Sequence, residues 1–265
     1  MRQIFSACKW ALLAAAVVAT TLGSSAWSRP SVTDIYSSAQ LRSGFDACTN
    51  VFPDGRSVDL RVVAVAPQWR AVALCSDDFA VVYSGLSKTP LLVVEKLSRQ
   101  SLKQAQSIKR SDDFFPDTRA KRRDRADLRD YKGSGYDRGH MAAAANRSSV
   151  RSMLQSFALS NMVPQHPTNN RKTWNKLERD TRRYVMRAKG DVFVFSGPLF
   201  DDETPKAVGK GRVWVPSHLF KLVVDPLAHK AWAHLVTNDG SPYRGPPLTY
   251  EEFVARTGWD PLPGR

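Results

Sequence analysis

Phe79-Ala80-Val81-Val82-Tyr83 is a short apolar run of β-branched and aromatic residues, which is typical of a buried strand. Comparable runs, separated by polar or Pro/Gly breaks, occur in both halves of the chain. They are 60–65, 71–74, 91–94, 192–195, 213–216, 220–224 and 231–236. We therefore predict that strands form the main framework of the fold.

Two stretches predict helices among these strands. Within 169–189, apolar residues recur at spacings of three and four, and Asn169 is placed to cap the helix. Thr249 and Glu252 form a capping box for a short final helix that Gly258 ends. Strands and a few helices in irregular order predict an α+β fold and disfavour a doubly wound α/β fold.

The N-terminus has the pattern of a signal peptide. Arg2 and Lys9 precede an apolar run that ends at Leu22, and small residues follow up to Ala26. The apolar run is shorter than the roughly 20 residues that a spanning helix needs. We expect cleavage near Ala26 or Ser28, and a periplasmic or secreted protein without stable membrane insertion. An uncleaved membrane anchor is the alternative.

Chain length and cysteine usage agree with an exported protein of one domain. The 265 residues suffice for one large domain. We predict a signal peptide at 1–26, an irregular segment at 27–44 and a single domain at 45–265. Cleavage removes Cys8 and leaves Cys48 and Cys75, which an oxidising compartment favours as a disulfide. Two buried free thiols are the alternative.

The charge of the chain points to an anionic partner. Lysine and arginine number 39 against 25 acidic residues, a formal net charge of +14. Such an excess favours a polyanion, because basic groups beside phosphates release condensed counterions. A solvated basic surface, or binding to anionic lipid, is the alternative reading. No glycine-rich phosphate loop or dinucleotide fingerprint is present in the sequence, so nucleotide-cofactor chemistry has no support.

The candidate chemistry begins at Asp137-Arg138-Gly139-His140. A neutral imidazole is a suitable general base near neutral pH. By itself, however, a histidine beside an arginine is more often structural than catalytic. The predicted helix that follows changes this balance.

Three polar residues of that helix are spaced to share one side of it. Asn170 and Glu178 are eight residues apart, and Arg182 follows four residues later. An amide oxygen is a hard ligand for Mg²⁺, which keeps several waters that a carboxylate can hold. A guanidinium beside them can clamp a phosphate. The alternative is a solvated Glu–Arg pair. Together with His140, the set suffices for phosphodiester hydrolysis.

Several blocks of the sequence closely resemble the DNA/RNA non-specific endonucleases. The resemblance covers roughly residues 45–260. It implies a mixed, largely antiparallel central sheet with flanking helices and a ββα-metal active-site motif. The blocks are 133–146, 160–165, 170–182, 194–200 and 215–221.

The resemblance also implies roles for particular residues. His140 corresponds to the general base, and Asn170 to the single direct Mg²⁺ ligand, with Mn²⁺ as the alternative ion. Glu178 matches a carboxylate that holds metal-bound water, and Arg182 a phosphate-binding arginine. The supporting residues are Asn161 and Asp137, with Arg138 bracing the loop.

The family carries a further arginine upstream of the histidine, and here the correspondence is loose. Arg110 is the first candidate for this transition-state arginine, and Arg119 and Arg122 are alternatives. The basic run around them is either a solvated face or a surface that tracks phosphates, and we favour the second. The nucleic-acid-binding candidates are Lys109, Arg119, Arg122 and Arg123.

The function expected from these features is hydrolysis of DNA and RNA without sequence preference, leaving 5′-phosphate ends. No recognition helix or zinc finger is apparent, and phosphate contacts carry no sequence information. One alternative is a nucleic-acid-binding protein that has lost catalysis, but His140 and Asn170 are both present. Another is a phosphodiesterase for a small substrate, which would favour a closed pocket and less exposed charge. The family also includes dimers, so a homodimer and an inhibitor protein are candidate partners.

Overall fold

A seven-stranded antiparallel sheet forms the centre of the protein. The computed structural model describes residues 35–59, 67–201 and 203–262. The expected signal peptide at 1–26, the segment 27–34 and the strand expected at 60–65 lie outside these ranges. In the part described, the strand order is β1-β2-β3-β6-β9-β10-β11, with every neighbouring pair antiparallel. The predicted α+β fold with a largely antiparallel sheet is confirmed.

Six strands of the central sheet follow the predicted apolar runs, whereas β11 does not. The central sheet contains β1 (Ala71–Cys75), β2 (Phe79–Ser84), β3 (Pro90–Leu97), β6 (Val192–Leu199), β9 (His218–Asp225), β10 (Lys230–Thr237) and β11 (Leu248–Thr249). Two small hairpins stand apart from it, β4 (Asp137–His140) with β5 (Met162–Gln165), and β7 (Ala207–Val208) with β8 (Val213–Trp214).

The helical segments connect and cover these strands. The α-helices are α3 (Arg99–Ala105), α4 (Leu128–Tyr131), α5 (Val150–Ser156), α6 (Asn175–Val185) and α7 (Tyr250–Thr257). The short 3₁₀ turns are η1 (Asp46–Val51), η2 (Pro53–Gly55), η3 (Pro67–Trp69), η4 (Arg122–Asp124), η5 (Ala144–Asn146) and η6 (Leu159–Asn161), and η7 (Asn169–Trp174) is a π-helix. In the part of the chain described, no helix is long and apolar enough to cross a bilayer.

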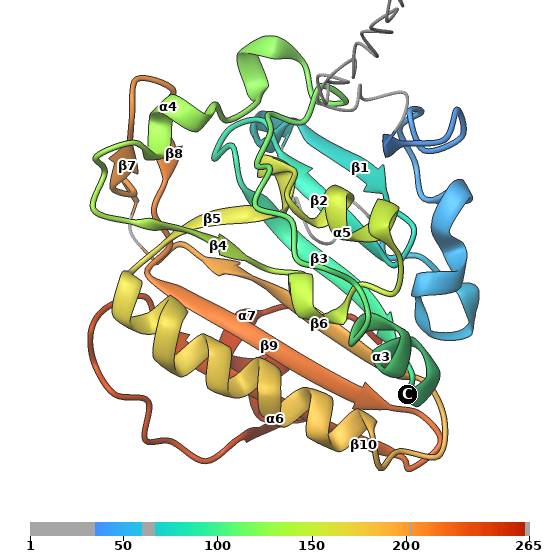
Figure 1. Ribbon diagram of the computed structural model, residues 1–265. Helices are drawn as coiled ribbons and strands as arrows, with labels where there is room; N and C mark the ends of the chain where they lie inside the picture. Colours follow the sequence, from blue (N-terminus) through green and yellow to red (C-terminus); the bar gives the residue numbers. More distant parts are fainter. Residues whose placement is uncertain (1–34, 60–66, 202, 263–265) are drawn as a thin grey trace, which may run out of the picture. The chain divides into compact units, whose positions relative to one another are not determined.

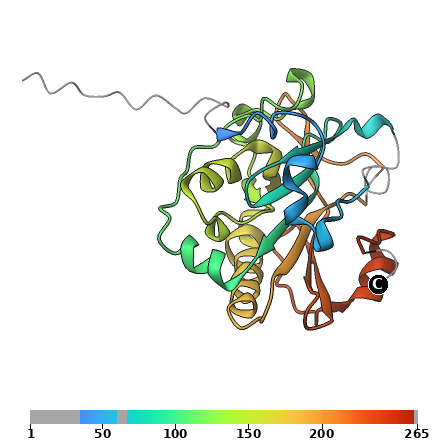
Figure 2. The same cartoon turned by 90° about the vertical axis from the view of Figure 1, so that its right-hand side faces the viewer.

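The sheet is covered on both faces because its strands alternate apolar side chains between two cores. On β2, Ala80 and Val82 join one core, whereas Phe79, Val81 and Tyr83 join the other. Helix α7 packs on the first face, and α6 with the β4–β5 hairpin lies on the second (Figures 1 and 2). The candidate site residues therefore lie on one side of the sheet.

The first core also contains the predicted disulfide. Cys48 of η1 and Cys75 of β1 are bonded and fully buried. This bond ties the segment before the sheet to an edge strand. The alternative of two free thiols is wrong for this pair.

The predicted capping of helix α7 is confirmed. The Thr249 hydroxyl accepts from the Glu252 amide, and the Glu252 carboxylate accepts from the Thr249 amide. Gly258 ends the helix with a left-handed φ of 67°, a conformation that glycine adopts without steric cost.

Helix α6 buries one stripe of its surface against the sheet. Leu177, Thr181 and Val185, spaced four residues apart, are its buried residues. The predicted cap at Asn169 is wrong, because Asn169 lies inside η7 and its amide nitrogen donates to the Thr237 carbonyl. The wider π turn takes Asn169 towards β10 and leaves the next residue, Asn170, beside β4.

Candidate active site

The β4–β5 hairpin places His140 at the floor of a cleft of about 790 Å³. Gly139 permits the close approach of the two strands, because a methyl group there would lie 2.6 Å from Cβ of Gln165. The His140 carbonyl accepts from the Trp174 indole at 3.0 Å, which ties β4 to η7. The backbone of the histidine is therefore fixed from both sides.

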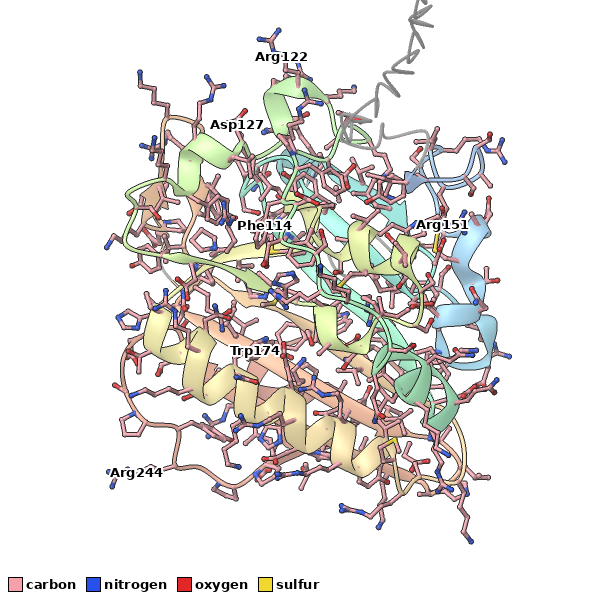
Figure 3. The ribbon with its side chains drawn as sticks, viewed as in Figure 1. Phe114, Arg122, Asp127, Arg151, Trp174 and Arg244 are labelled. Carbon is pink, nitrogen blue, oxygen red and sulfur yellow. A yellow bond between two sulfur atoms is a disulfide. The ribbon has the colours of Figure 1, made fainter. Side chains whose placement is uncertain are left out.

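Two phenylalanine rings surround the imidazole of His140. The ring centroids of Phe157 and Phe114 lie 4.9 and 5.7 Å from that of His140. Figure 3 labels Phe114 and, below it in this view, Trp174. Each of the two phenylalanine rings also contacts an arginine. The guanidinium of Arg110 lies 5.1 Å from the centroid of the Phe157 ring, and that of Arg138 lies 4.0 Å from the centroid of the Phe114 ring.

These surroundings keep the imidazole neutral. His140 is only 9% exposed, and among the residues described its Nε2 has no hydrogen-bond partner. Burial and, to a smaller extent, the positive charges of Arg110, Arg147 and Arg138 together lower the pKa of His140 to about 3. A neutral imidazole is the form that accepts a proton.

Asn170 faces the cleft with its amide held in one orientation. Its Nδ2 donates to the Asp137 carboxylate at 2.9 Å, so its amide oxygen is the atom left for a ligand. Arg171 also binds Asp137, at 2.7 and 2.9 Å. Partial burial alone would raise the pKa of Asp137, but these two partners hold it below its ordinary value.

Glu178 and Arg182 line the same cleft from α6. Burial raises the pKa of Glu178, and the charges of Lys221 and Arg182 oppose that rise. One Arg182 nitrogen donates to the side-chain oxygen of Asn146 at 3.2 Å. The residues that the sequence assigns to the base, the metal and the phosphate clamp are thus brought to one cleft.

These residues suit a hard divalent cation. An amide oxygen fixed by its neighbour and a half-buried carboxylate in the same cleft are the oxygen donors that Mg²⁺ takes. In the part of the chain described, no group of three or more His, Cys, Asp or Glu residues could hold a metal. Any ion would therefore rely on few protein ligands, as Mg²⁺ commonly does.

Asn161 supports the cleft from below. Its side chain is fully buried, accepts from the Ala142 amide at 2.8 Å, and donates to the carbonyls of Ala142 and Ser156. It therefore fixes the backbone just after His140. This contact is consistent with the supporting role expected for Asn161.

A buried ionic network, which the sequence analysis did not include, lies beside the cleft. Glu95 of β3 accepts from both Arg147 and the Asn146 amide, and the Glu95 and Arg147 side chains are almost fully buried. Because Asn146 in turn binds Arg182, Glu95 positions an arginine of the cleft through an intermediary.

Lys221 of β9 is a second residue that the sequence analysis missed. It is 1% exposed, and its ammonium donates to Ser196 at 2.8 Å and lies 4.5 Å from the Trp174 ring. Burial lowers its pKa, and the charges of Glu95 and Glu178 oppose that shift. Glu95 and Lys221 share a sequence signal, since each is a charged residue within an apolar strand, and burial would then require a partner.

The basic residues upstream of His140 separate into different environments. Arg110 lines the cleft, whereas Arg122 does not line it and lies at the upper edge of the view, above Phe114 (Figure 3). Lys109 and Arg123 are exposed but do not line the cleft, and Arg123 lies 3.6 Å from Asp124. Of the three candidates for the upstream arginine, only Arg110 is in the cleft.

The prediction that Arg119 belongs to the nucleic-acid-binding surface is wrong. Its side chain is 3% exposed, binds the equally buried Asp117 at 2.7 Å, and lies 3.6 Å from the Tyr36 ring. These contacts leave it unavailable to a phosphate. Arg119 is a structural residue that joins the segment before the sheet to the loop before β4.

Charge is unevenly distributed along the cleft. Acidic side chains there number three against six basic ones, and two of the three are bound to arginines, Asp112 to Arg110 and Asp137 to Arg171. The basic lining residues are Arg110, Arg129, Lys132, Arg138, Arg171 and Arg182.

Comparison with known proteins agrees with the family resemblance. Residues 61–264 match the sequence profile of the DNA/RNA non-specific endonucleases. Human mitochondrial endonuclease G is 37% identical over 158 residues, which are 56% of this chain and 52% of that protein. Mitochondrial nuclease EXOG of Xenopus laevis is 38% identical over 155 residues, 55% of this chain and 43% of that protein. The matched region spans about half the length of these curated relatives.

A solved structure is similar as well. It is described as the crystal structure of the EndoG/EndoGI complex, showing the mechanism of EndoG inhibition. The TM-score is 0.64 at 29% identity, and the similarity covers 71% of this chain and 84% of that one.

Proposed function

Because this chain belongs to the DNA/RNA non-specific endonuclease family, we propose that it hydrolyses phosphodiester bonds in DNA and RNA without sequence preference. One observation carries the proposal. His140, Asn170, Glu178 and Arg182 line a single cleft in which basic residues outnumber acidic ones two to one. A binding protein without activity would not need a neutral imidazole beside an oriented amide.

In the proposed reaction, His140 accepts a proton from a water molecule. The water oxygen then forms a bond to phosphorus, and the bond from phosphorus to the 3′ oxygen breaks, which leaves a 5′-phosphate. The departing 3′ oxygen takes a proton from solvent to become a hydroxyl, and His140 returns its proton to solvent. Arg182 and Arg110 place positive charge beside the non-bridging phosphate oxygens. A bound Mg²⁺, or Mn²⁺, supplies further positive charge to the phosphate and the leaving oxygen.

Asn170 would hold that ion through its amide oxygen, and Glu178 would accept hydrogen bonds from the water molecules that accompany it. Asp137 keeps the Asn170 amide oriented. Glu95, through Asn146, keeps Arg182 at the cleft. These side chains orient the reacting groups and take no part in proton transfer.

The test is cleavage of plasmid, single-stranded DNA and RNA by purified protein, with Mg²⁺ and with EDTA. We expect His140→Ala to lower the rate by at least about 10²-fold, the usual scale for a positioned base. We expect Asn170→Ala and EDTA each to suppress cleavage. His218→Gln, at a half-buried histidine outside the cleft, should keep the wild-type rate.

Each alternative gives a different result in this assay. Full cleavage in EDTA would reject the metal mechanism, and an unchanged His140→Ala variant would reject the base. Binding without cleavage would identify a protein that has lost catalysis. Hydrolysis of a small phosphodiester but not of a polymer would identify a small-substrate phosphodiesterase.

We also propose export to the periplasm or beyond the cell. The buried Cys48–Cys75 disulfide supports an oxidising compartment, and residues 1–26 have the pattern of a signal peptide. The curated relatives named here are mitochondrial. N-terminal sequencing of protein recovered from outside the cytoplasm should begin near residue 27 or 29. Full-length protein in the cytoplasm alone would reject export.

Protein partners are part of the proposal as well. The similar solved structure is a complex of EndoG with EndoGI, and it concerns the mechanism by which EndoG is inhibited. We propose that this chain binds a protein inhibitor and that two copies of it form a homodimer. Size-exclusion chromatography with light scattering gives the oligomeric state, and a monomer at all concentrations would reject the dimer.

A further inference from the structure

A second groove, of about 700 Å³, adjoins the cleft on the side of α3 and the end of α6. Arg110, Ala145 and Arg182 line both spaces, so the two are continuous at these residues. Figures 1 and 2 both show α3 beside the C-terminal end of α6. We call this second space the α3–α6 groove.

The floor of the α3–α6 groove is apolar. Leu102 and Ala105 of α3 and Met153 of α5 are buried there, while Ile108 and Met186 are half-buried. These side chains offer an adaptable apolar surface, and methionine in particular fits ligands of varied shape. Such a floor suits one face of a nucleobase and does not distinguish one base from another.

The rim of the groove is basic. Arg179 and Arg183 lie four residues apart on α6, about 6 Å of helix rise, and Arg187 follows just after the helix ends at Val185. All three are exposed, and none of the described residues that line the groove is acidic. Arg183 lies 3.1 Å from Asp180, whereas no ion pair is formed by Arg179 or Arg187 within the residues described. The free charges are complementary to an anionic chain.

We propose that the α3–α6 groove binds the nucleotide next to the scissile phosphate, with its base unstacked on the apolar floor and its flanking phosphate at the arginine rim. This inference rests on the proposed function, because a polymer cut in the cleft must continue beyond it. The α3–α6 groove continues the cleft and combines positive charge with an apolar surface. Both properties match a single strand, whose bases are free to leave the stack.

The first measurement is affinity for a fluorescently labelled single-stranded DNA oligonucleotide in EDTA, by anisotropy. Met186→Glu places a carboxylate on the floor, and Arg187→Ala removes one rim charge. We expect at least tenfold weaker binding for Met186→Glu and a severalfold loss for Arg187→Ala.

Two variants serve as matched controls. Met186→Gln has the same size as Met186→Glu without its charge, and should lose less than threefold. Arg256→Ala removes an exposed arginine from the last turn of α7, on the opposite face of the sheet, and should bind as the wild type does.

The second measurement is the ratio of kcat/KM for the oligonucleotide to kcat/KM for bis(4-nitrophenyl) phosphate, which lacks flanking nucleosides. With Mg²⁺ present, this ratio should fall about tenfold for Met186→Glu. Wild-type affinity and ratio in both groove variants would overturn the inference. Weaker binding by Arg187→Ala alone would also overturn it, because the groove would then contact the phosphates of the strand but not a base. A wild-type protein that cleaves no nucleic acid would instead overturn the proposed function.

Discussion

His140 is a neutral imidazole between Phe114 and Phe157, with two arginines stacked on those rings. The arrangement has two effects. The surroundings bury Nε2, and the arginines add positive charge that opposes protonation. A histidine in water would be partly protonated near pH 6.5. In this site it stays neutral in mildly acidic solution.

The buried imidazole also makes stability depend on pH. The folded-state pKa of His140 is lowered to about 3, whereas the unfolded value is about 6.5. Between these values the unfolded chain binds a proton that the folded protein does not. Stability is therefore fully present above pH 6.5 and is lost as pH falls towards 3, by up to about 1.4 kcal/mol per pH unit.

Urea unfolding from pH 8 to pH 4, compared between wild type and His140→Gln, measures this effect. The difference in unfolding free energy between the two should be constant above pH 6.5. Below it, the wild type should lose stability faster than the variant. Parallel curves over the whole range would show that His140 is protonated in the folded protein.

Arg119 gives a prediction of a different kind, because it is buried with Asp117. Arg119→Ala leaves a buried carboxylate without its partner, which should cost about 3–5 kcal/mol. Exposed Arg122 carries the same charge in the same basic run, and Arg122→Ala should change stability by less than about 0.5 kcal/mol. Denaturant unfolding at neutral pH separates the two. Equal effects would mean that Arg119 is solvated.

At the scale of elements, the predictable parts are those that depend on local pattern. The strands around Phe79–Tyr83 follow from apolar runs, and α7 follows from Thr249, Glu252 and Gly258. The start of the long helix does not. Asparagine is a common capping residue, but the Asn169 side chain donates a hydrogen bond to the carbonyl of Thr237, far along the chain. Asn169 therefore lies inside a π turn and does not cap the helix. No local signal encodes that partner.

The β4–β5 hairpin carries the element-scale prediction. Gly139→Ala would bring a methyl group to 2.6 Å from Cβ of Gln165, which is attached directly to the backbone and cannot rotate away. The strands must separate, and His140 moves with β4. We expect at least a tenfold loss of nuclease activity with the folded state retained, measured together with circular dichroism.

Gly245→Ala is the matched control, since its added methyl group would meet only ordinary contacts at 3.6 Å or more. It should keep wild-type activity. An active Gly139→Ala variant would mean that the hairpin tolerates a wider spacing, and that Gly139 does not set the position of His140.

At the scale of the whole molecule, the sheet brings together residues that no sequence spacing relates. Glu95 comes from β3 and Arg182 from α6, and Asn146 links them from a loop. Spacing predicted that Asn170, Glu178 and Arg182 share one side of a helix, and all three line the cleft. Contacts between separate elements, such as the Arg119–Asp117 pair, depend on the tertiary fold. The sequence therefore identified the candidate groups but not the network that orients them.

The net charge of +14 leads to the last prediction, the dependence of cleavage on salt. Three basic residues of the cleft, Lys132, Arg138 and Arg182, form no ion pair within the residues described, so they are free to contact phosphates. For three phosphate contacts, kcat/KM on long DNA below saturation should fall about 40-fold between 50 and 200 mM NaCl, because each contact releases condensed counterions. Bis(4-nitrophenyl) phosphate, with a single charge, should lose only a few-fold over the same range. Equal salt dependence for both substrates would mean that the basic cleft does not follow the strand, and that the excess positive charge acts elsewhere on the surface.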